Sequence, residues 1–278
     1  MSSDLKPAWS EQFDVGTLKR VEKLNLPSAI TREWALDGAT GAGVKVAVID
    51  SGIEGDHPLV GELNGNIVIE HDLTVEEEYR VIDDAEPRDV FGHGSACAGI
   101  IRKVAPECEM YSIRVLGAML TGKGTVFAGG LKWALENGMQ VINLSLSTKK
   151  RDFFSMFHEL TDEAYFKNVM LVSAINNVPA PSYPSQYSSV FSVAAHEGKD
   201  PMHWDYNPSP PVEFGAPGID VEVPWQKGST IRSTGNSFAA PHIAGIVTRI
   251  LSKHPGLTPF QMKTILHALA DNSGPDTG

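Results

Sequence analysis

Three side chains in this chain of 278 residues have the types needed to activate a hydroxyl group, and they occur in the order Asp50, His93, Ser237. Each also has an ordinary interpretation: Asp50 as a turn residue in Asp-Ser-Gly, His93 as a structural histidine between glycines, and Ser237 as a helix cap. A serine hydroxyl becomes a useful nucleophile when an imidazole removes its proton and a carboxylate fixes the tautomer of that imidazole. The three residues together therefore indicate acyl-transfer chemistry.

The segments around these residues are those expected of elements that could position them. Residues 44–49 form an apolar run typical of a strand buried on both faces of a parallel sheet, and Asp50 follows directly. Ser237 follows a glycine-containing turn and begins a helix rich in small residues, whose N-terminus favours developing negative charge. His93 begins another apolar helix.

Strand patterns alternate with helix patterns along the chain, which predicts an α/β fold. We expect one domain, residues 28–278, with helices in layers on both faces of a mostly parallel sheet, preceded by an N-terminal arm at residues 1–27. Residues 74–89 are acidic and poor in apolar side chains, and we expect a surface loop there; residues 177–186 and 207–217 are expected as Pro-rich loops. The expected strands are 44–49, 66–70, 110–115, 141–146, 169–174 and 190–194, and the expected helices are 31–38, 93–103, 126–137, 153–166 and 237–253, with another beginning after Thr258.

The segments around the three residues resemble the sequence blocks of subtilisin-family serine proteases. The matching blocks are Val-Ala-Val-Ile-Asp50-Ser-Gly-Ile, His93-Gly-Ser-Ala-Cys-Ala-Gly and Gly235-Asn-Ser237-Phe-Ala-Ala-Pro-His, and the similarity extends from about Leu26 to Ala270. The resemblance implies a three-layer α/β/α fold with Ser237 as nucleophile, His93 as general base and then acid, and Asp50 as the residue that orients His93.

The resemblance also implies an asparagine that stabilises the oxyanion of the reaction. Asn176 aligns best with the family's asparagine, with its side-chain amide and the Ser237 N–H as donors. Asn177 is the alternative, because Ile175 stands where the family has a glycine before the asparagine.

Two stretches match the segments that bind an extended peptide in the family. They imply a peptide or protein substrate. Where the family commonly has glycine this chain has Ser147 and Ser182, which predicts a narrower and more polar pocket before the scissile bond and poor cleavage after Phe. The implied substrate-binding residues are Gly122, Lys123 and Gly124 on one side, Ser145, Leu146 and Ser147 on the other, and Ser182.

Composition excludes several other classes of function. A formal net charge of −11 argues against a nucleic-acid surface, and no apolar run is long enough to span a membrane. Cys97 and Cys108 have no metal-ligand spacing, so we expect two buried free thiols and no metal ligands. Residues 101–106 lack the calcium loop that secreted relatives carry, so no cofactor is expected, although the acidic segment 74–89 could bind calcium weakly.

The polar N-terminus lacks the apolar core of a signal peptide, which favours a cytoplasmic protein. The alternative is a secreted protein, if this chain is the mature part of a longer precursor. The oligomeric state stays open.

The expected function is a serine endopeptidase that works through an acyl-enzyme. One alternative is a peptide-maturation protease or transpeptidase (a macrocyclase) on the same scaffold, because the acidic segment between Asp50 and His93 could restrict access to chosen peptides. Another is a catalytically dead peptide-binding module. An α/β-hydrolase esterase fits poorly, because in that fold the acid and histidine follow the serine and Ala239 would be glycine.

Overall fold

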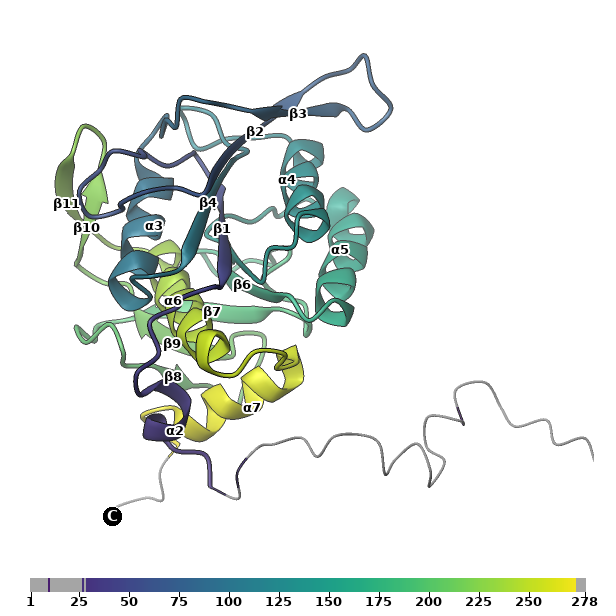
Figure 1. The fold of residues 1–278 in the computed structure, drawn as a ribbon. Helices are drawn as coiled ribbons and strands as arrows, with labels where there is room; N and C mark the ends of the chain where they lie inside the picture. The colour runs from purple at the N-terminus through teal and green to yellow at the C-terminus, as the bar shows by residue number, and fades with distance from the viewer. Residues whose placement is uncertain (1–9, 11–26, 28, 274–278) are drawn as a thin grey trace, which may run out of the picture.

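The computed structural model describes residue 10, residue 27 and residues 29–273, so the predicted arm lies almost entirely outside the described residues. A nine-stranded sheet forms the centre of the molecule (Figure 1). Its pairings are parallel except at the two edges, where β3 and β8 pair antiparallel with their neighbours. From edge to edge the strands are β3 (Tyr79–Asp83), β2 (Gly65–His71), β4 (Glu109–Arg114), β1 (Lys45–Asp50), β5 (Val141–Leu144), β6 (Met170–Ala174), β7 (Phe191–His196), β9 (Phe214–Pro217) and β8 (Asp205–Tyr206).

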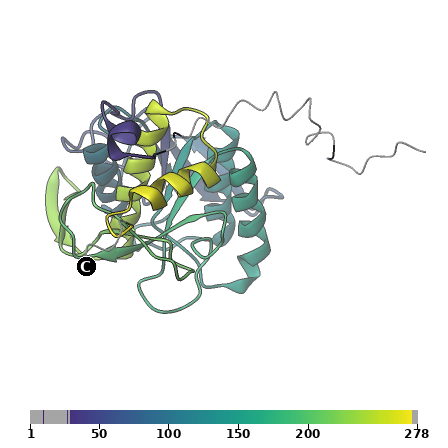
Figure 2. The ribbon, with the colours of Figure 1, turned by 90° about the horizontal axis from the view of Figure 1, so that it is seen from below.

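Helices cover both faces of this sheet, which gives the predicted three layers (Figures 1 and 2). α4 and α5 lie on one face and α3 and α6 on the other, while α7 crosses the lower end of the molecule. A separate antiparallel hairpin, β10 (Val221–Trp225) with β11 (Ser229–Ser233), packs beside α3. The helices are α2 (Arg32–Leu36), α3 (His93–Val104), α4 (Gly124–Glu136), α5 (Phe154–Phe166), α6 (Asn236–Lys253) and α7 (Pro259–Leu269), with a 3₁₀ turn η2 (Arg151–Phe153) before α5.

The central strand β1 illustrates why the sheet is buried on both faces. Val46 and Val48 point into the core beneath α3 and α6, whereas Ala47 and Ile49 point into the core beneath α4 and α5. Side chains alternate between the two faces of a strand, so an unbroken apolar run supplies both cores at once.

The helix α6, whose sequence is rich in small residues, packs closely against α3 at Gly245. A Cβ atom on Gly245 would lie 2.6 Å from the Cβ of Val104, so only glycine allows α6 to approach α3 at this point. The α6 helix is thereby held firmly against the helix that begins with His93.

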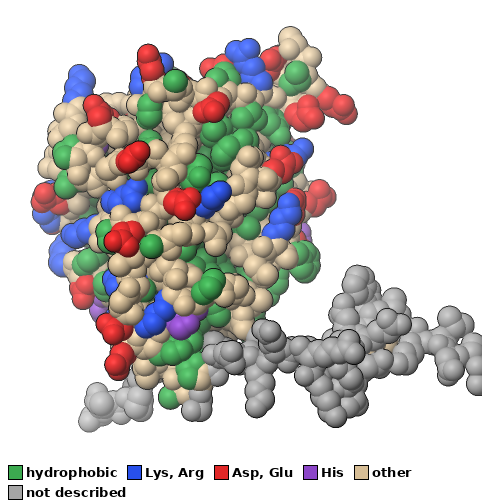
Figure 3. All heavy atoms as spheres, in the orientation of Figure 1, with side chains coloured by type: hydrophobic (Ala, Val, Ile, Leu, Met, Phe, Trp, Pro, Cys, Tyr) green, Lys and Arg blue, Asp and Glu red, His purple; other side chains and the backbone are tan. Residues whose placement is uncertain are grey.

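Several short strands were missed from the sequence. The acidic segment 74–89 contains β3, which pairs with β2, and the Pro-rich segment 207–217 contains β9. An edge strand such as β3 has a largely exposed surface, so its stability comes from pairing rather than from an apolar pattern. The β2–β3 hairpin projects from the molecule (Figure 1), and acidic side chains, drawn in red, gather at the same place in Figure 3. The acidic residues of this hairpin turn are Asp72, Glu76, Glu77 and Glu78.

Two predicted helix starts are confirmed in detail. The side chain of Thr31 accepts a hydrogen bond from the Trp34 N–H, and Thr258 forms a full capping box with Gln261. Both signals are local, which is why the sequence was sufficient to identify them.

Candidate active site

Asp50 and His93 meet at the carboxyl end of β1. The Asp50 carboxylate is fully buried, and both of its oxygens lie 2.9 Å from Nδ1 of His93. His93 reaches this position because α3 begins very close to the turn after β1: a Cβ on Gly94 would lie 2.0 Å from the Gly52 carbonyl oxygen. This contact assigns the Nδ1 proton to the bond with Asp50, which leaves Nε2 available as a base.

Opposing effects act on the pKa of His93. Burial lowers it, but the charge and hydrogen bond of Asp50 and the charge of Asp89 raise it more, so the pKa lies above its ordinary value. The carboxylates therefore favour the imidazolium that forms when His93 takes a proton.

Sequence reasoning missed Asp89, which was counted with the acidic loop. Its Oδ1 accepts hydrogen bonds from the Ser51 hydroxyl and from the N–H groups of Phe91 and Gly92, and its Oδ2 accepts one from the Ser95 N–H. These bonds tie the segment after β1 to the first turn of α3. The available sequence signal was that Asp89 lies four residues before His93, close to the start of the predicted helix, where aspartate commonly accepts hydrogen bonds from backbone N–H groups.

Ser237 lies in the first turn of α6, beside the Asp50–His93 pair. Its carbonyl oxygen accepts a hydrogen bond from the Ser145 hydroxyl at 2.8 Å and contacts the Cys97 thiol at 3.5 Å. The ring of the next residue, Phe238, lies 5.5 Å from the His93 ring, centre to centre. His93 and Ser237 line the same cleft, which has a volume of about 470 Å³. The structure thus brings the three predicted residues together.

Asn177, the alternative, faces this cleft, and Asn176 does not. The Oδ1 of Asn177 accepts a hydrogen bond from the Asn236 N–H at 2.9 Å, which leaves its amide N–H groups free to donate. Its Nδ2 and the Ser237 Oγ lie 3.6 and 3.2 Å from the position that a Cβ on Gly235 would take. The geometry therefore departs from the alignment that favoured Asn176.

The polar groups of Asn176 form hydrogen bonds within the protein, and its side chain bonds within its own loop. Its Oδ1 accepts a hydrogen bond from the Val178 N–H at 3.0 Å, and its carbonyl oxygen accepts one from the side chain of Asn236. It lines a smaller hollow of about 170 Å³ that adjoins Ser237.

Both predicted substrate-binding stretches line the large cleft. The first is Gly122, Lys123 and Gly124, of which Gly124 is already the first residue of α4, and the second is Ser145, Leu146 and Ser147. The second set also lines the smaller hollow. Further lining residues that the sequence did not single out are Leu116, Leu120, Thr121, Phe127, Thr148, Lys150 and Phe153.

Ser182 does not line either of these hollows. Its side chain is completely buried, and its hydroxyl lies 2.6 Å from the hydroxyl of Ser185, so the two serines satisfy each other. The prediction that Ser182 narrows the pocket does not agree with this position.

The charged side chains that line the cleft are positive, whereas the chain as a whole has a negative formal net charge. Lys123 and Lys150 line it, and among the described residues no acidic side chain does. In a chain with a formal net charge of −11, this surface is locally positive.

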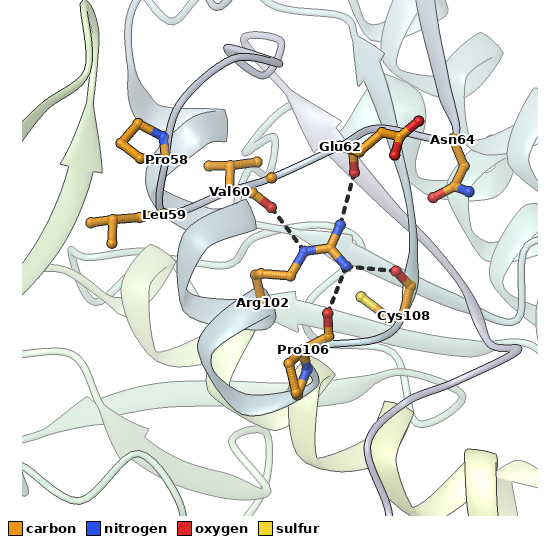
Figure 4. A pocket seen from close by; sticks show the side chains of 9 residues that line it. Pro58, Leu59, Val60, Glu62, Asn64, Arg102, Pro106 and Cys108 are labelled. Atoms are coloured by element: carbon orange, nitrogen blue, oxygen red, sulfur yellow. Dashed lines mark hydrogen bonds between the residues drawn. The ribbon is translucent and has the colours of Figure 1, made fainter.

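Another hollow, of about 400 Å³, lies away from the catalytic residues, beside the end of α3 (Figure 4). The guanidinium of Arg102 donates hydrogen bonds there to the carbonyl oxygens of Val60, Glu62, Pro106 and Cys108. These hydrogen bonds join the segments on either side of α3, which indicates a structural role for Arg102.

Both cysteines are free and buried, as predicted. Burial raises the pKa of the Cys108 thiol to about 11 and raises that of Cys97 well above its ordinary value. Neither thiol is therefore in the reactive thiolate form at neutral pH.

Comparison with known proteins agrees with this geometry. A family model described as the subtilase family matches residues 41–277. The chain belongs to the subtilase family. It is 31% identical over 267 residues to Subtilisin Savinase of Lederbergia lenta, covering 91% of each chain. It is 29% identical over 257 residues to Thermitase of Thermoactinomyces vulgaris, covering 88% of this chain and 87% of that protein.

Among solved structures, the subtilase resembles a cold adapted subtilisin-like serine proteinase with a TM-score of 0.69. The sequence identity is 25%, and the match covers 94% of this chain and 93% of the other. The predicted family and fold are confirmed, and this subtilase is a serine endopeptidase. Within residues 29–273, no helix is both long enough and apolar enough to cross a bilayer.

Proposed function

We propose that this subtilase hydrolyses peptide bonds through an acyl-enzyme formed on Ser237. The observation that carries the proposal is the buried contact of the Asp50 carboxylate with Nδ1 of His93, at the edge of a cleft that His93 shares with Ser237. Nε2 of His93 takes the Ser237 proton as the oxygen attacks the substrate carbonyl, and then returns it to the leaving amine. Water repeats the sequence on the acyl-enzyme, and none of these steps requires a cofactor.

The oxyanion is proposed to receive hydrogen bonds from the side-chain amide of Asn177 and from the N–H of Ser237. The latter group belongs to the first turn of α6, where helix N–H groups have no intrahelical acceptor. The hydrogen bond from the Asn236 N–H to Asn177 Oδ1 supports the role, because it orients the amide before substrate arrives.

The substrate is proposed to bind as an extended strand between the segments around Lys123 and Leu146. Main-chain hydrogen bonds would supply affinity that tolerates many sequences, while pockets distinguish the side chains. The smaller hollow, of about 170 Å³, would hold the residue before the scissile bond.

Ser147 and Asn176 border that hollow, so we expect cleavage after small or polar residues and poor cleavage after Phe. Replacement of Ser147 with Gly should raise kcat/KM for a Phe substrate relative to an Ala substrate, because the substitution removes a side chain from the hollow. Paired peptides that differ only at this residue measure the ratio. A clear Phe preference in the natural chain would overturn this specificity.

The function itself is tested by incubating the chain with an unstructured peptide and weighing the products. Hydrolysis adds the mass of one water, whereas transfer to an amine gives a ligated or cyclised product without it, so the same assay separates a protease from a transpeptidase. Ser237→Ala should abolish both, and Ser209→Ala, on an exposed loop, serves as the matched control. A natural chain that binds the peptide but leaves it intact would instead indicate a binding module.

A further inference from the structure

A cluster of side chains that could bind a metal ion lies at the edge of the sheet opposite β3. His196 ends β7, Asp205 begins β8, and His203 lies in the segment between them. Nε2 of His203 is 3.4 Å from Oδ1 of Asp205, and Nε2 of His196 is 4.0 Å from Oδ2 of Asp205. One ligand atom from each of the three residues lies within 4.8 Å of the others.

The sheet creates the space for this cluster by placing a glycine between the two strands. β9 separates β7 from β8, and its Gly215 pairs with Ala194 on one side and Asp205 on the other. A Cβ on Gly215 would lie 3.3 Å from the His196 ring and 3.7 Å from the Asp205 Cβ. Without a side chain at this position, His196 and Asp205 can approach one another across β9.

The separations suit a tetrahedral metal ion. Zinc bonds of about 2.0–2.1 Å to His nitrogen and carboxylate oxygen place tetrahedral ligand atoms about 3.3–3.4 Å apart. The distance from His203 Nε2 to Oδ1 of Asp205 already matches, whereas His196 Nε2 lies 4.0 Å from the other carboxylate oxygen, Oδ2, and would have to move about 0.6–0.7 Å closer to share the ion. Nε2 of His196 is buried and has no hydrogen-bond partner among the described residues.

The surroundings orient one of the histidines for this role. Nδ1 of His203 lies 3.5 Å from Oδ2 of Asp271, and that oxygen accepts hydrogen bonds from Arg32 and from the Trp204 N–H. A carboxylate that accepts a hydrogen bond from Nδ1 of a ligating histidine keeps the proton on Nδ1, so that Nε2 is available to bind the metal. His196 is held differently, because its Nδ1 accepts a hydrogen bond from the Gly198 N–H at 2.9 Å.

We propose that His196, His203 and Asp205 bind one divalent ion of the zinc class, with a fourth position open to water. Imidazole and carboxylate ligands suit zinc, and the partial exposure of His203 and Asp205 gives the ion a route from solvent. Coordination by Nε2 of His196 moves its proton to Nδ1 and breaks the bond from Gly198. This site is separate from the Asp50–His93 pair, and the proposal does not rest on the proposed function.

The test uses the full chain carrying Ser237→Ala, which prevents self-digestion, after treatment with a chelator. Calorimetric titration with Zn²⁺ should show one equivalent bound, and His203→Ala or Asp205→Asn should weaken binding by at least about tenfold. His158→Ala is the matched control, because His158 also lies beside a carboxylate, 3.7 Å from Asp162, but belongs to no cluster of three potential ligands within residues 29–273. It should bind Zn²⁺ like its parent.

Two further measurements do not depend on activity. The melting temperature should rise by about 5 °C when free Zn²⁺ exceeds its dissociation constant about a hundredfold. The Gly198 amide NMR signal should shift on zinc addition in the parent and stay in place in His203→Ala. Far-UV circular dichroism confirms that each variant is folded. Absence of zinc binding, or binding that survives both ligand substitutions, would overturn the proposal.

Discussion

Substitution of Asn177 gives the most direct test of how the site stabilises the negative charge that develops on the oxyanion. Replacement of Asn177 by Asp keeps the oxygen that accepts the Asn236 N–H and removes the amide donor. In subtilisin, where the effect of this kind of donor is established, its loss lowers kcat by about 10²–10³, equivalent to about 2.7–4 kcal/mol of transition-state stabilisation. We expect a loss of at least that size here, with KM little changed, because the donor acts on the oxyanion and the substituted carboxylate adds repulsion.

Asn176→Ala is the matched control for this experiment. Its Oδ1 accepts a hydrogen bond from the Val178 N–H, so the substitution should cost about 0.5–1.5 kcal/mol of stability and leave kcat within a few-fold of the natural chain for a peptide with Ala before the scissile bond. Initial rates on a chromogenic peptide at several concentrations give kcat and KM for both variants. If Asn176→Ala lowered kcat by a hundredfold while Asn177→Asp did not, the assignment would be reversed.

Four further predictions concern the catalytic residues and the groups around them and along the cleft. The kcat/KM value should fall as pH drops through the pKa of His93, because the base must be neutral, and the midpoint should lie above the ordinary histidine value of about 6.5. Asp50→Asn should move that midpoint to lower pH and reduce kcat by about 10⁴, as a pH series of initial rates would show; an unmoved midpoint contradicts the assigned cause. Asp89→Asn replaces an acceptor of the Ser95 N–H with a weaker or mismatched one and should cost about 1–3 kcal/mol of unfolding free energy, measured with denaturant in an inactivated chain. An unchanged unfolding midpoint would refute this role. Lys150→Glu should lower kcat/KM about two- to fivefold for a peptide with Glu on the acyl side relative to its Gln analogue, whereas Lys149→Glu, which does not line the cleft, should not.

The parts of the site that the sequence predicted well are encoded by short segments. The blocks around Asp50, His93 and Ser237 each combine a functional residue with the turn or helix start that positions it. The cap at Thr258 was predictable for the same reason, since all its partners lie within one helical turn. Their identification required no knowledge of which segments meet in space.

The parts that were missed depend on contacts between distant segments. The proposed preference for Asn177 over Asn176 rests on hydrogen bonds to Asn236, about sixty residues later in the chain. Ser182 was expected beside the substrate, but its pairing with Ser185 holds it inside the protein. A local pattern contains neither kind of information.

The acidic segment shows a related difficulty. Its composition predicted a loop, although Tyr79–Asp83 pairs with β2 and Asp89 binds the N-terminus of α3. Acidic residues are usually solvated, so composition alone could not separate an exposed hairpin from a buried carboxylate that holds the active site.

The central claim is that His93 and Asp50 activate Ser237 as a nucleophile. Its most direct test is the mass of the intact chain after exposure to a fluorophosphonate, followed by fragmentation to locate the label. We predict one adduct on the natural chain, located at Ser237, with none on Ser237→Ala and strongly slowed labelling of His93→Ala. A folded natural chain that remains unlabelled, or one labelled at another serine, would contradict the account.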